Sequence, residues 1–292
     1  MCRRPLPLRI PPVHVLEKID TVLRLRERLS DGRRARGLVP TMGALHAGHE
    51  ALIARARREC DEVVVSIFVN PLQFDNPDDL TRYPRTLEAD VETCRAHGVD
   101  VVFAPSALEM YPQAPECTVG VGRLGDHLCG KFRPGHFQGV ATVVLKLFGL
   151  IQPSRAYFGE KDAQQLAIVR RLVADFNVPV HVVGVPTVRE ADGLAMSSRN
   201  RHLSSDGRRL AVGLYRALVD AKERIAKGER NADAIRAAAT ACISESPEIR
   251  LEYFDIVDPG TLQPVDVIEG RALVAGALCV GSTRLIDNVW AP

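Results

Sequence analysis

The sequence predicts an α/β protein: a mostly parallel sheet with helices on both faces, followed by a smaller α+β domain. Three observations lead to this prediction. Short apolar runs alternate with helical stretches of about 10–15 residues through the first two thirds of the chain. Polar, glycine-rich segments follow the apolar runs, where open α/β sheets bind ligands. Beyond Pro186 the alternation stops, and two long helical stretches come next.

The elements of the first domain follow from the period of the apolar residues. Leu16, Ile19, Leu23 and Leu29 form a helical stripe that stops at Ser30-Asp31-Gly32. The predicted strands lie at 37–39, 63–69, 99–104, 156–158 and 180–185. The helices predicted between them span about 49–60, 86–97, 137–151 and 162–176. Because crossovers between parallel strands are right-handed, these helices should cover both faces of one sheet.

The last third of the chain predicts a second domain, reached through a polar hinge loop at 186–202. Its helices are expected at 204–227 and 231–246, and its strand-like runs at 250–258 and 271–290. The predicted organisation is a flexible arm at 1–13, a ligand-binding α/β domain at 14–186 and a smaller α+β domain at 187–292.

Composition narrows the classes of partner. Lys and Arg number 38 against 36 Asp and Glu, and the basic residues are scattered, so small substrates are favoured over nucleic acid. The seven cysteines form no Cys-x-x-Cys pair, which argues against a disulfide framework or a zinc site and favours a reducing cytoplasm. No apolar run approaches the roughly 18 residues of a transmembrane helix, so no membrane span is expected.

The first motif, VPTMGALHAGH at 39–49, runs from a buried strand through a glycine turn into a helix. His46 and His49 are three residues apart and lie on one side of the first helical turn. The amides and dipole of that turn favour a phosphate, and two histidine donors suit the oxygens of a triphosphate. The structural alternative is a helix cap beside a solvent-facing histidine. The combination of strand, turn and His-x-Gly-His favours nucleotide binding.

The second motif, FGEKDAQQ at 158–165, also joins a strand to a helix. Lys161 can reach a phosphate as a point charge, and Gly159 allows close approach of a ribose or adenine. Gln165 offers a donor and an acceptor to a small polar substrate. Asp162 is expected to cap the following helix, which is compatible with a functional role.

The third motif is MSSRN at 196–200, in the loop after the last strand of the first domain. The hydroxyls of Ser197 and Ser198 and the guanidinium of Arg199 suit a mobile clamp for phosphate oxygens. The alternative is a polar linker whose serines cap the helix near 204. The segments NPLQF at 70–74 and FRPGHF at 132–137 add an amide turn and an Arg–His pair suited to a carboxylate, and structural turns explain each equally well.

Together these segments resemble the pantothenate synthetase, or pantoate–β-alanine ligase, family. The matching strings run in the family's order from about residue 37 to 289; they are VPTMGALHAGH, SIFVNPLQF, YPRT, GKFRPGHFQGVATVVLKLF, YFGEKDAQQL, GVPTVREADGLAMSSRN and STRLIDN. The family resembles nucleotidyltransferases with a HIGH-like signature, here His46-Ala47-Gly48-His49, and class I aminoacyl-tRNA synthetases. Met196–Arg199 stands where those synthetases carry a KMSKS loop.

The resemblance implies a Rossmann-like domain at 14–186 that binds ATP and pantoate, a C-terminal lid at 187–292, and a homodimer. It also implies a reaction: ATP, pantoate and β-alanine give pantothenate, AMP and pyrophosphate, with Mg²⁺. The residues assigned to catalysis are His46, His49, Lys161 and Arg199, with His49 as proton donor or phosphate stabiliser. The residues assigned to ATP are Met42, Gly43, Ala44, Leu45, His46, Ala47, Gly48, His49, Gly159, Glu160, Lys161, Asp162, Val188, Met196, Ser197, Ser198 and Arg199.

For the other substrates, the resemblance assigns Gln73 and Gln165 to pantoate, with Gln73 also near β-alanine. The residues added to this group are Asn70, Arg133 and His136. An acidic cluster after YPRT lies near Mg²⁺ in the family; here that stretch is Leu87-Glu88-Ala89-Asp90, and only Asp90 is assigned to the metal. Ala163 replaces a common aromatic residue, which is expected to loosen local packing.

Three other functions are weighed. A nucleotidyltransferase that keeps the nucleotide in its product shares the His-x-Gly-His core but is mostly shorter and lacks the GKFRPGHFQGV segment. A nucleotide sensor on a decayed site should have lost charged residues, whereas His46, His49, Lys161 and Arg199 are all present. A tRNA synthetase should show a basic surface, which the near-neutral charge argues against.

Overall fold

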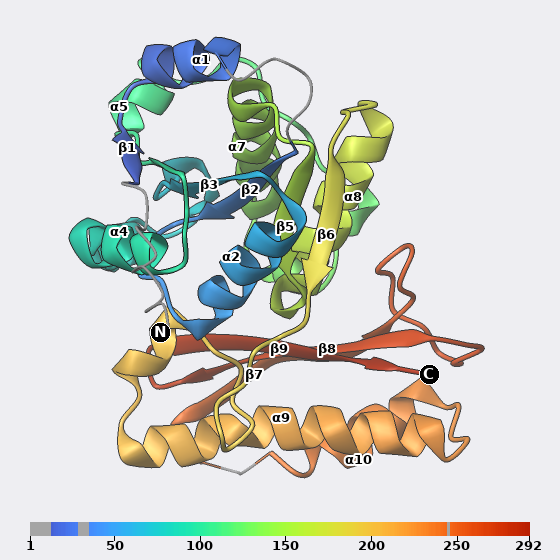
Figure 1. Ribbon diagram of the computed structural model, residues 1–292. Coiled ribbons are helices and arrows are strands. Elements are labelled where there is room, and N and C mark those ends of the chain that lie inside the picture. Colours follow the sequence, from blue (N-terminus) through green and yellow to red (C-terminus); the bar gives the residue numbers. More distant parts are fainter. Residues whose placement is uncertain (1–12, 29–34, 244–245) are drawn as a thin grey trace, which may run out of the picture.

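The computed structural model describes residues 13–28, 35–243 and 246–292, and Figure 1 shows a parallel-sheet domain above a smaller antiparallel-sheet domain. Six parallel strands form the first sheet, in the order β1-β4-β3-β2-β5-β6. The strands are β1 (His14–Leu16), β2 (Arg36–Thr41), β3 (Glu62–Ile67), β4 (Val101–Phe103), β5 (Arg155–Gly159) and β6 (His181–Val185). The strand order reverses between β2 and β5, and such a switch point is where open α/β sheets bind ligands.

Helices cover both faces of this sheet because successive strand side chains point to opposite sides. In β2, Leu38 packs into the core on the α7 side, while the next residue, Val39, packs on the α2 side. The first face is covered by α1 (Ile19–Arg28), α7 (His136–Ile151) and α8 (Ala163–Asp175). The other face is covered by α2 (Ala47–Glu59) and α4 (Leu87–Ala96). The predicted α/β class is confirmed.

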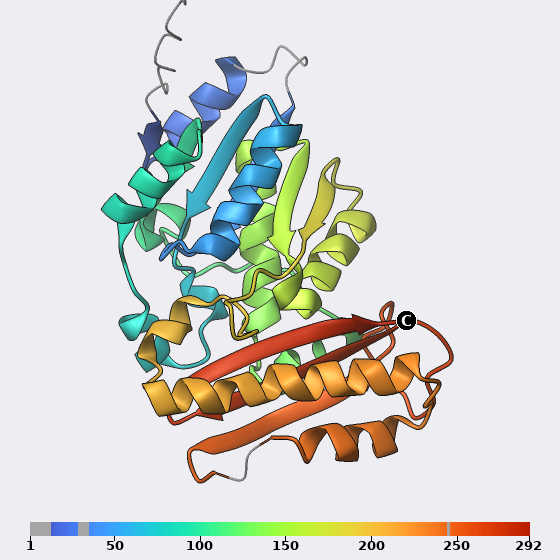
Figure 2. The same cartoon turned by 60° about the horizontal axis from the view of Figure 1, so that its bottom comes forward.

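The second domain is an antiparallel sheet with helices on one side, as Figure 2 shows. Its elements are α9 (Ser205–Ala226), α10 (Ala232–Thr240), β7 (Ile249–Val257), β8 (Ala272–Val280) and β9 (Thr283–Ala291). All nine residues of β8 are buried. One set, which includes Val274 and Leu278, packs beneath α9 and α10, while the alternate set, which includes Ala275 and Ala277, packs against the first domain.

Short helical segments connect the main elements and shape the site. Several begin with a side chain that accepts a backbone N–H, such as Asn70 before η1 and Asn76 before α3. These segments are η1 (Pro71–Gln73), α3 (Pro77–Arg82), α5 (Ala107–Met110), η2 (Arg123–Gly125), α6 (Cys129–Phe132), η3 (Glu160–Asp162) and η4 (Ser198–His202). They are too short for a period of apolar residues to predict them.

Three predicted elements are corrected, while the other strands and helices agree within about two residues, the usual scatter of boundary assignments. Leu16 belongs to β1, which pairs with β4, and α1 begins only at Ile19. The run 271–290 is a hairpin that turns at Gly281, whose φ of 56° suits glycine. The helix predicted at 231–246 ends at Thr240, whose hydroxyl donates back to the Arg236 carbonyl.

The predicted domain boundary falls just after β6 ends at Val185. The N-terminal arm at 1–13 lies almost wholly outside the described residues. Among those that are described, no helix is long and apolar enough to cross a membrane. The described cysteines are free thiols, and those that are buried are Cys60, Cys94, Cys129 and Cys279.

Candidate active site

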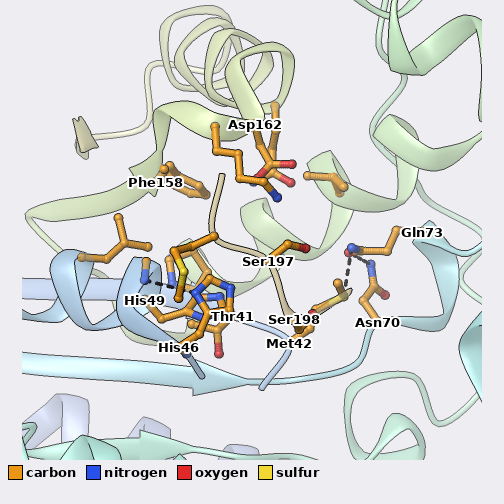
Figure 3. A pocket seen from close by; sticks show the side chains of 18 of the residues that line it. Thr41, Met42, His46, His49, Asn70, Gln73, Phe158, Asp162, Ser197 and Ser198 are labelled. Atoms are coloured by element: carbon orange, nitrogen blue, oxygen red, sulfur yellow. Dashed lines mark hydrogen bonds between the residues drawn. The ribbon is translucent and has the colours of Figure 1, made fainter. Parts of the chain in front are cut away.

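One cavity of about 240 Å³ opens beyond the carboxyl ends of β2, β3, β5 and β6, at the switch point of the sheet. Figure 3 shows His46 and His49 on one side of it, Asn70 and Gln73 on another, and Asp162 opposite the histidines. The predicted site residues that line it are Met42, His46, Gly48, His49, Asn70, Gln73, Arg133, His136, Gly159, Lys161, Asp162, Gln165, Val188, Met196, Ser197, Ser198 and Arg199. Motifs spread over about 160 residues of sequence therefore meet at one pocket.

Six predicted residues do not line this cavity. Gly43, Ala44 and Leu45 form the turn behind Met42, and Ala47 is the first residue of α2. The remaining two are Glu160 and Asp90. Their contacts, described below, place them in the support of the pocket rather than on its wall.

The two histidines form a reciprocal cap at the start of α2. His46 Nδ1 accepts the Gly48 N–H at 3.1 Å, and His49 Nδ1 accepts the His46 N–H at 3.3 Å. Since both Nδ1 atoms are acceptors, each neutral ring carries its hydrogen on Nε2. The cap and the proposed phosphate role are thus compatible, because capping occupies only one nitrogen of each ring.

Burial keeps this pair neutral. It lowers the pKa of His46 to about 4, with a further contribution from the positive charge of Lys161. It lowers the pKa of His49 to about 3, helped by His46, whose ring centroid lies 4.1 Å away. Both rings are therefore uncharged hydrogen-bond donors at neutral pH.

Gly48 is required by this arrangement. A Cβ atom at this position would lie 2.8 Å from His46 Cε1, closer than real Cβ contacts allow. The glycine of His-x-Gly-His thus leaves room for the capping ring of His46.

Asp90 holds the turn that precedes the histidines. Its Oδ2 accepts the Ala44 N–H at 3.0 Å and its Oδ1 accepts the Leu45 N–H at 2.8 Å. Thr86 Oγ1 also donates to Oδ2, and the Asp90 side chain is buried. This support stabilises a turn in which Gly43 and Ala44 both have positive φ.

The carboxylate of Asp90 thus accepts three hydrogen bonds from the protein, and it does not line the cavity. Among the described residues no group of three His, Cys, Asp or Glu side chains is arranged to hold a metal ion. The assignment of Asp90 as a Mg²⁺ ligand therefore does not fit the donor set of this chain. A sequence cannot distinguish an aspartate that binds metal from one that binds backbone amides.

A second wall of the pocket is built around Gln73. Asn70 Nδ2 donates to Gln73 Oε1 at 3.1 Å and to the Gly139 carbonyl at 3.1 Å. Asn70 Oδ1 accepts from the Leu72 N–H and from Tyr111 Oη. All polar side-chain atoms of Asn70 are therefore used within the protein, and this residue orients Gln73, whose Nε2 contacts Met42 Sδ at 3.1 Å.

Arg133 and His136 support the same residue from behind. His136 Nδ1 donates to the Gln73 carbonyl at 2.8 Å, and an Arg133 N–H donates to the same oxygen at 3.1 Å. His136 Nε2 accepts from Arg133, and burial followed by that positive charge lowers the pKa of His136 to about 4. Arg133 also pairs with Asp75 at 3.3 Å. The pair thus anchors Gln73, and Arg133 remains a cation at the pocket wall.

The turn after β5 contributes Lys161 and Asp162. Within the described residues, the Lys161 ammonium makes no ion pair. Asp162 occupies the N-cap position of α8, yet its side chain accepts no capping hydrogen bond, which corrects the predicted cap. Its carboxylate therefore stays available at the pocket. Ala163 is buried in the core shared by the two domains.

The loop after β6 reaches across the mouth of the pocket. Ser197 Oγ accepts the Arg199 N–H at 3.2 Å and so caps η4. The helix predicted near 204, α9, is capped by Ser204 instead. Arg199 donates to Asp79 of α3 at 3.3 Å. The half-exposed pair joins this loop to α3.

Sequence reasoning missed the apolar and aromatic lining. Tyr83 lies in the YPRT string and lines the cavity, as does Phe158, which lies directly before Gly159. The α7 face adds Val143 and Val144. The helical period predicts burial of these valines but cannot show which buried residues face a cavity.

The fold and site together define the class: an α/β nucleotide-binding protein of the HIGH-motif type, with neutral histidine donors and a lysine facing one pocket. The comparison with known families gives the same class and narrows it. The family described as Pantoate-beta-alanine ligase matches residues 14–290, and the chain belongs to this family.

Two relatives show the range of architectures. The pantothenate synthetase of Heliobacterium modesticaldum is 54% identical over 264 residues, which cover 90% of this chain and 94% of that protein. The bifunctional pantoate ligase/cytidylate kinase of Synechococcus elongatus is 57% identical over 256 residues, covering 87% of this chain and 49% of that protein. The chain thus spans about half the length of the bifunctional relatives.

Solved structures match over the full architecture. The pantothenate synthetase of Thermus thermophilus superposes with a TM-score of 0.87 at 48% identity, covering 95% of this chain and 99% of that one. The pantoate-beta-alanine ligase of Francisella tularensis, complexed with beta-gamma ATP and beta-alanine, has a TM-score of 0.77 at 35% identity, with coverage of 95% and 97%. Both domains of the chain are therefore shared with these enzymes.

Proposed function

We propose that this protein joins pantoate to β-alanine at the expense of ATP, giving pantothenate, AMP and pyrophosphate through a pantoyl-adenylate. The observation that supports this most directly is the neutral pair His46 and His49 facing Lys161 across one pocket. Membership of the pantoate–β-alanine ligase family supports the choice of substrates. So does the Francisella tularensis ligase, a relative complexed with beta-gamma ATP and beta-alanine.

The proposed arrangement puts the triphosphate at the N-terminus of α2. There the Nε2 hydrogens of His46 and His49 donate to its oxygens, and Lys161 supplies positive charge. The loop of Ser197, Ser198 and Arg199 covers the phosphates. Gly159, Val188 and Met196 face the adenosine. Pantoate binds between Gln73 and Gln165, and Arg133 attracts a carboxylate near Gln73.

In the first half-reaction the ionised carboxylate of pantoate attacks the α-phosphorus of ATP, and the bond to the pyrophosphate oxygen breaks. A carboxylate needs no general base at neutral pH. The protein's task is in-line positioning and stabilisation of charge on the phosphates. Neutral histidines suit this task because they donate hydrogen bonds without holding the pyrophosphate as a counter-ion.

In the second half-reaction the neutral amine of β-alanine attacks the carbonyl carbon of the adenylate. The new C–N bond forms, the C–O bond to AMP breaks, and the amine loses a proton. Asp162, whose carboxylate lacks a capping partner, faces the pocket and is the acid-base group proposed to accept that proton. Exclusion of water by the loop 186–202 protects the adenylate from hydrolysis.

Mg²⁺ is proposed to enter with ATP as part of the substrate, held by phosphate oxygens. No protein ligand set is assigned to it, for the reasons given for Asp90. A homodimer and a cytoplasmic location also remain proposals. They follow from the resemblance to the family and from the pattern of cysteines.

The test measures pyrophosphate and AMP formed from ATP and Mg²⁺, with pantoate and with or without β-alanine. We expect pyrophosphate that requires pantoate, and AMP release that β-alanine accelerates. A product that retains the nucleotide would indicate a nucleotidyltransferase instead. Folded protein that binds ATP but forms no pantoate-dependent pyrophosphate would overturn the choice of substrate.

A further inference from the structure

The turn that carries Lys161 is held by a residue of the other domain. Asn288 of β9 donates both hydrogens of its side-chain amide, one to the Glu160 carbonyl at 2.9 Å and one to the Lys161 carbonyl at 2.8 Å. Asn288 is only 6% exposed, so these bonds are shielded from water. An amide side chain is suited to this task because a single nitrogen supplies both donors.

Open space lies next to this turn. A cavity of about 30 Å³ beside Asn288 is lined also by Lys161, Asp162 and Gln165. Because protein atoms do not fill this side of the turn, the two hydrogen bonds from Asn288 to its carbonyls are direct contacts that hold its position.

Asn288 itself is held rigidly. Asp287 Oδ1 accepts the Asn288 N–H at 2.8 Å, and Arg189 forms a two-pronged ion pair with Asp287 at 2.6 and 2.9 Å. Another bond from Arg189 reaches the Asn288 carbonyl at 3.3 Å. The Arg189 guanidinium also lies 3.9 Å from the centre of the Tyr215 ring. Arg189, Asp287 and Asn288 are named the β9 node below.

Arg189 of the β9 node belongs to the hairpin 188–196, which brings Val188 and Met196 to the pocket lining. Arg189 pairs with Ala195 as an isolated antiparallel bridge, and the Met196 N–H donates to the Val188 carbonyl at 2.9 Å. A further Arg189 bond reaches the Gly193 carbonyl at 3.0 Å. The hairpin 188–196 and the Lys161 turn are therefore both hydrogen-bonded to β9, the hairpin to Asp287 and Asn288 and the turn to Asn288.

We propose that Asn288 is a positioning residue for adenylyl transfer: it fixes the Lys161 turn, and through the β9 node it keeps that turn in register with the hairpin 188–196. The inference rests on the proposed role of Lys161. It adds that the second domain sets the position of this lysine.

A double-mutant cycle tests this proposal. Asn288→Ala should lower the rate of adenylate formation by about 10²-fold, the cost of misplacing a reacting group by about 1 Å, with most of the loss in kcat. Lys161→Ala should lower it at least as much. In the Lys161→Ala background, Asn288→Ala should cost less than about twofold more, because the residue through which it acts is gone.

The matched control is Asn231→Ala. Asn231 is also an asparagine of the second domain, and its Oδ1 caps α10 by accepting the Ala234 N–H at 2.9 Å, away from the pocket lining. This variant should lose stability without losing activity. Thermal unfolding of all variants separates folding from catalysis. If Asn288→Ala fails to fold, Asn288→Ser keeps one donor and carries the cycle instead.

Each outcome is decisive. Additive losses in the cycle, or an Asn288→Ala enzyme with normal turnover, would overturn the positioning role while leaving Lys161 in the site. Near-normal turnover of Lys161→Ala would instead overturn the proposed site itself. The two failures are therefore distinguishable in one set of measurements.

Discussion

Two turns bring hydrogen-bond donors to the same pocket, and they are stabilised in different ways. The turn before α2 is held from within its own domain, where Asp90 accepts two of its amides and the histidines cap each other. The turn after β5 is held from outside, by an asparagine 127 residues further along the chain. The supports of the first turn all lie in the parallel-sheet domain, whereas the second turn is also held by a hydrogen-bond donor of the second domain.

This difference shows which part of the site depends on one domain and which part depends on both. The histidine turn has its supports within about 50 residues of sequence, inside the first domain. The Lys161 turn depends on the contact between the domains. Substitutions in the two turns should therefore fail in different ways, and the predictions below exploit this contrast.

The largest expected effect comes from removing a donor at the first turn. His46→Ala and His49→Ala should each lower adenylate formation by about 10²–10³-fold, the usual cost of losing one donor to developing charge. The measurement is pantoate-dependent pyrophosphate release in a single turnover. His97→Ala is the control, because His97 ends α4, bonds the Thr93 carbonyl and lies outside the pocket. Activity near normal in both pocket variants would remove the pair from the proposed site.

The next prediction tests whether Asp90 accepts hydrogen bonds from the turn or binds a metal ion. Asp90→Asn places an amide NH₂ beside backbone donors and should cost about 1–3 kcal/mol of folding free energy, together with activity. The Mg²⁺ concentration for half-maximal activity should stay unchanged, because the carboxylate serves the turn. A weakened response to Mg²⁺ at normal stability would restore Asp90 as a ligand.

A double variant tests whether the two turns are supported independently of each other. Asp90→Asn and Asn288→Ala act on separate supports with no shared partner, so their effects on stability should add within about 0.5 kcal/mol. Chemical denaturation of the single and double variants measures this. A coupling much larger than that value would mean that the two turns form one structural unit.

A smaller effect is expected from Gly48→Ala. The added methyl group would lie 2.8 Å from His46 Cε1, so the His46 ring would have to leave its capping position. Adenylate formation should fall, but by less than the loss of the ring in His46→Ala, because His49 and Lys161 remain. A loss as large as that of His46→Ala would indicate that the turn itself has collapsed, which circular dichroism of the variant would reveal.

The smallest effect on activity is expected from a change of pH. In the unfolded chain both histidines take up protons near pH 6.5, whereas in the folded protein the pKa values lie near 4 and 3. The unfolded state therefore binds more protons below pH 6.5, and stability should fall from there down through pH 4. Adenylate formation should show no step at pH 6.5 from these residues. Melting temperatures across pH 4–8, compared with those of His49→Ala, test this directly.

Most of the fold could be predicted from the sequence because apolar residues repeat at regular intervals along its strands and helices. Alternating apolar periods identify the parallel strands and their helices, and they fail where no period exists, as in the three-residue β1 and the short η1. Within 271–290 only the run 272–280 is continuously apolar, because β8 is buried on both faces, and the hairpin turns at Gly281 directly after it.

The site could be predicted only in part. The motifs identify His46, His49, Lys161 and Arg199 because their residue types are unusual at strand ends. They cannot show that Asn70 uses its amide inside the protein, or that Asp162 leaves its helix uncapped. Asn288 lies within the STRLIDN string, yet the sequence assigns it no role, because its partners are backbone carbonyls of a distant segment and leave no pattern.

The strand β8 belongs to two cores at once. Leu273, Ala275 and Ala277 pack with Phe137 and Ala163 of the first domain, while Val274 and Leu278 pack under the helices of the second. Neither half could be separated from the other without exposing a continuous apolar face to water. We therefore expect the two domains to melt as one cooperative unit, and any opening that admits substrates to be confined to the loops at the pocket mouth.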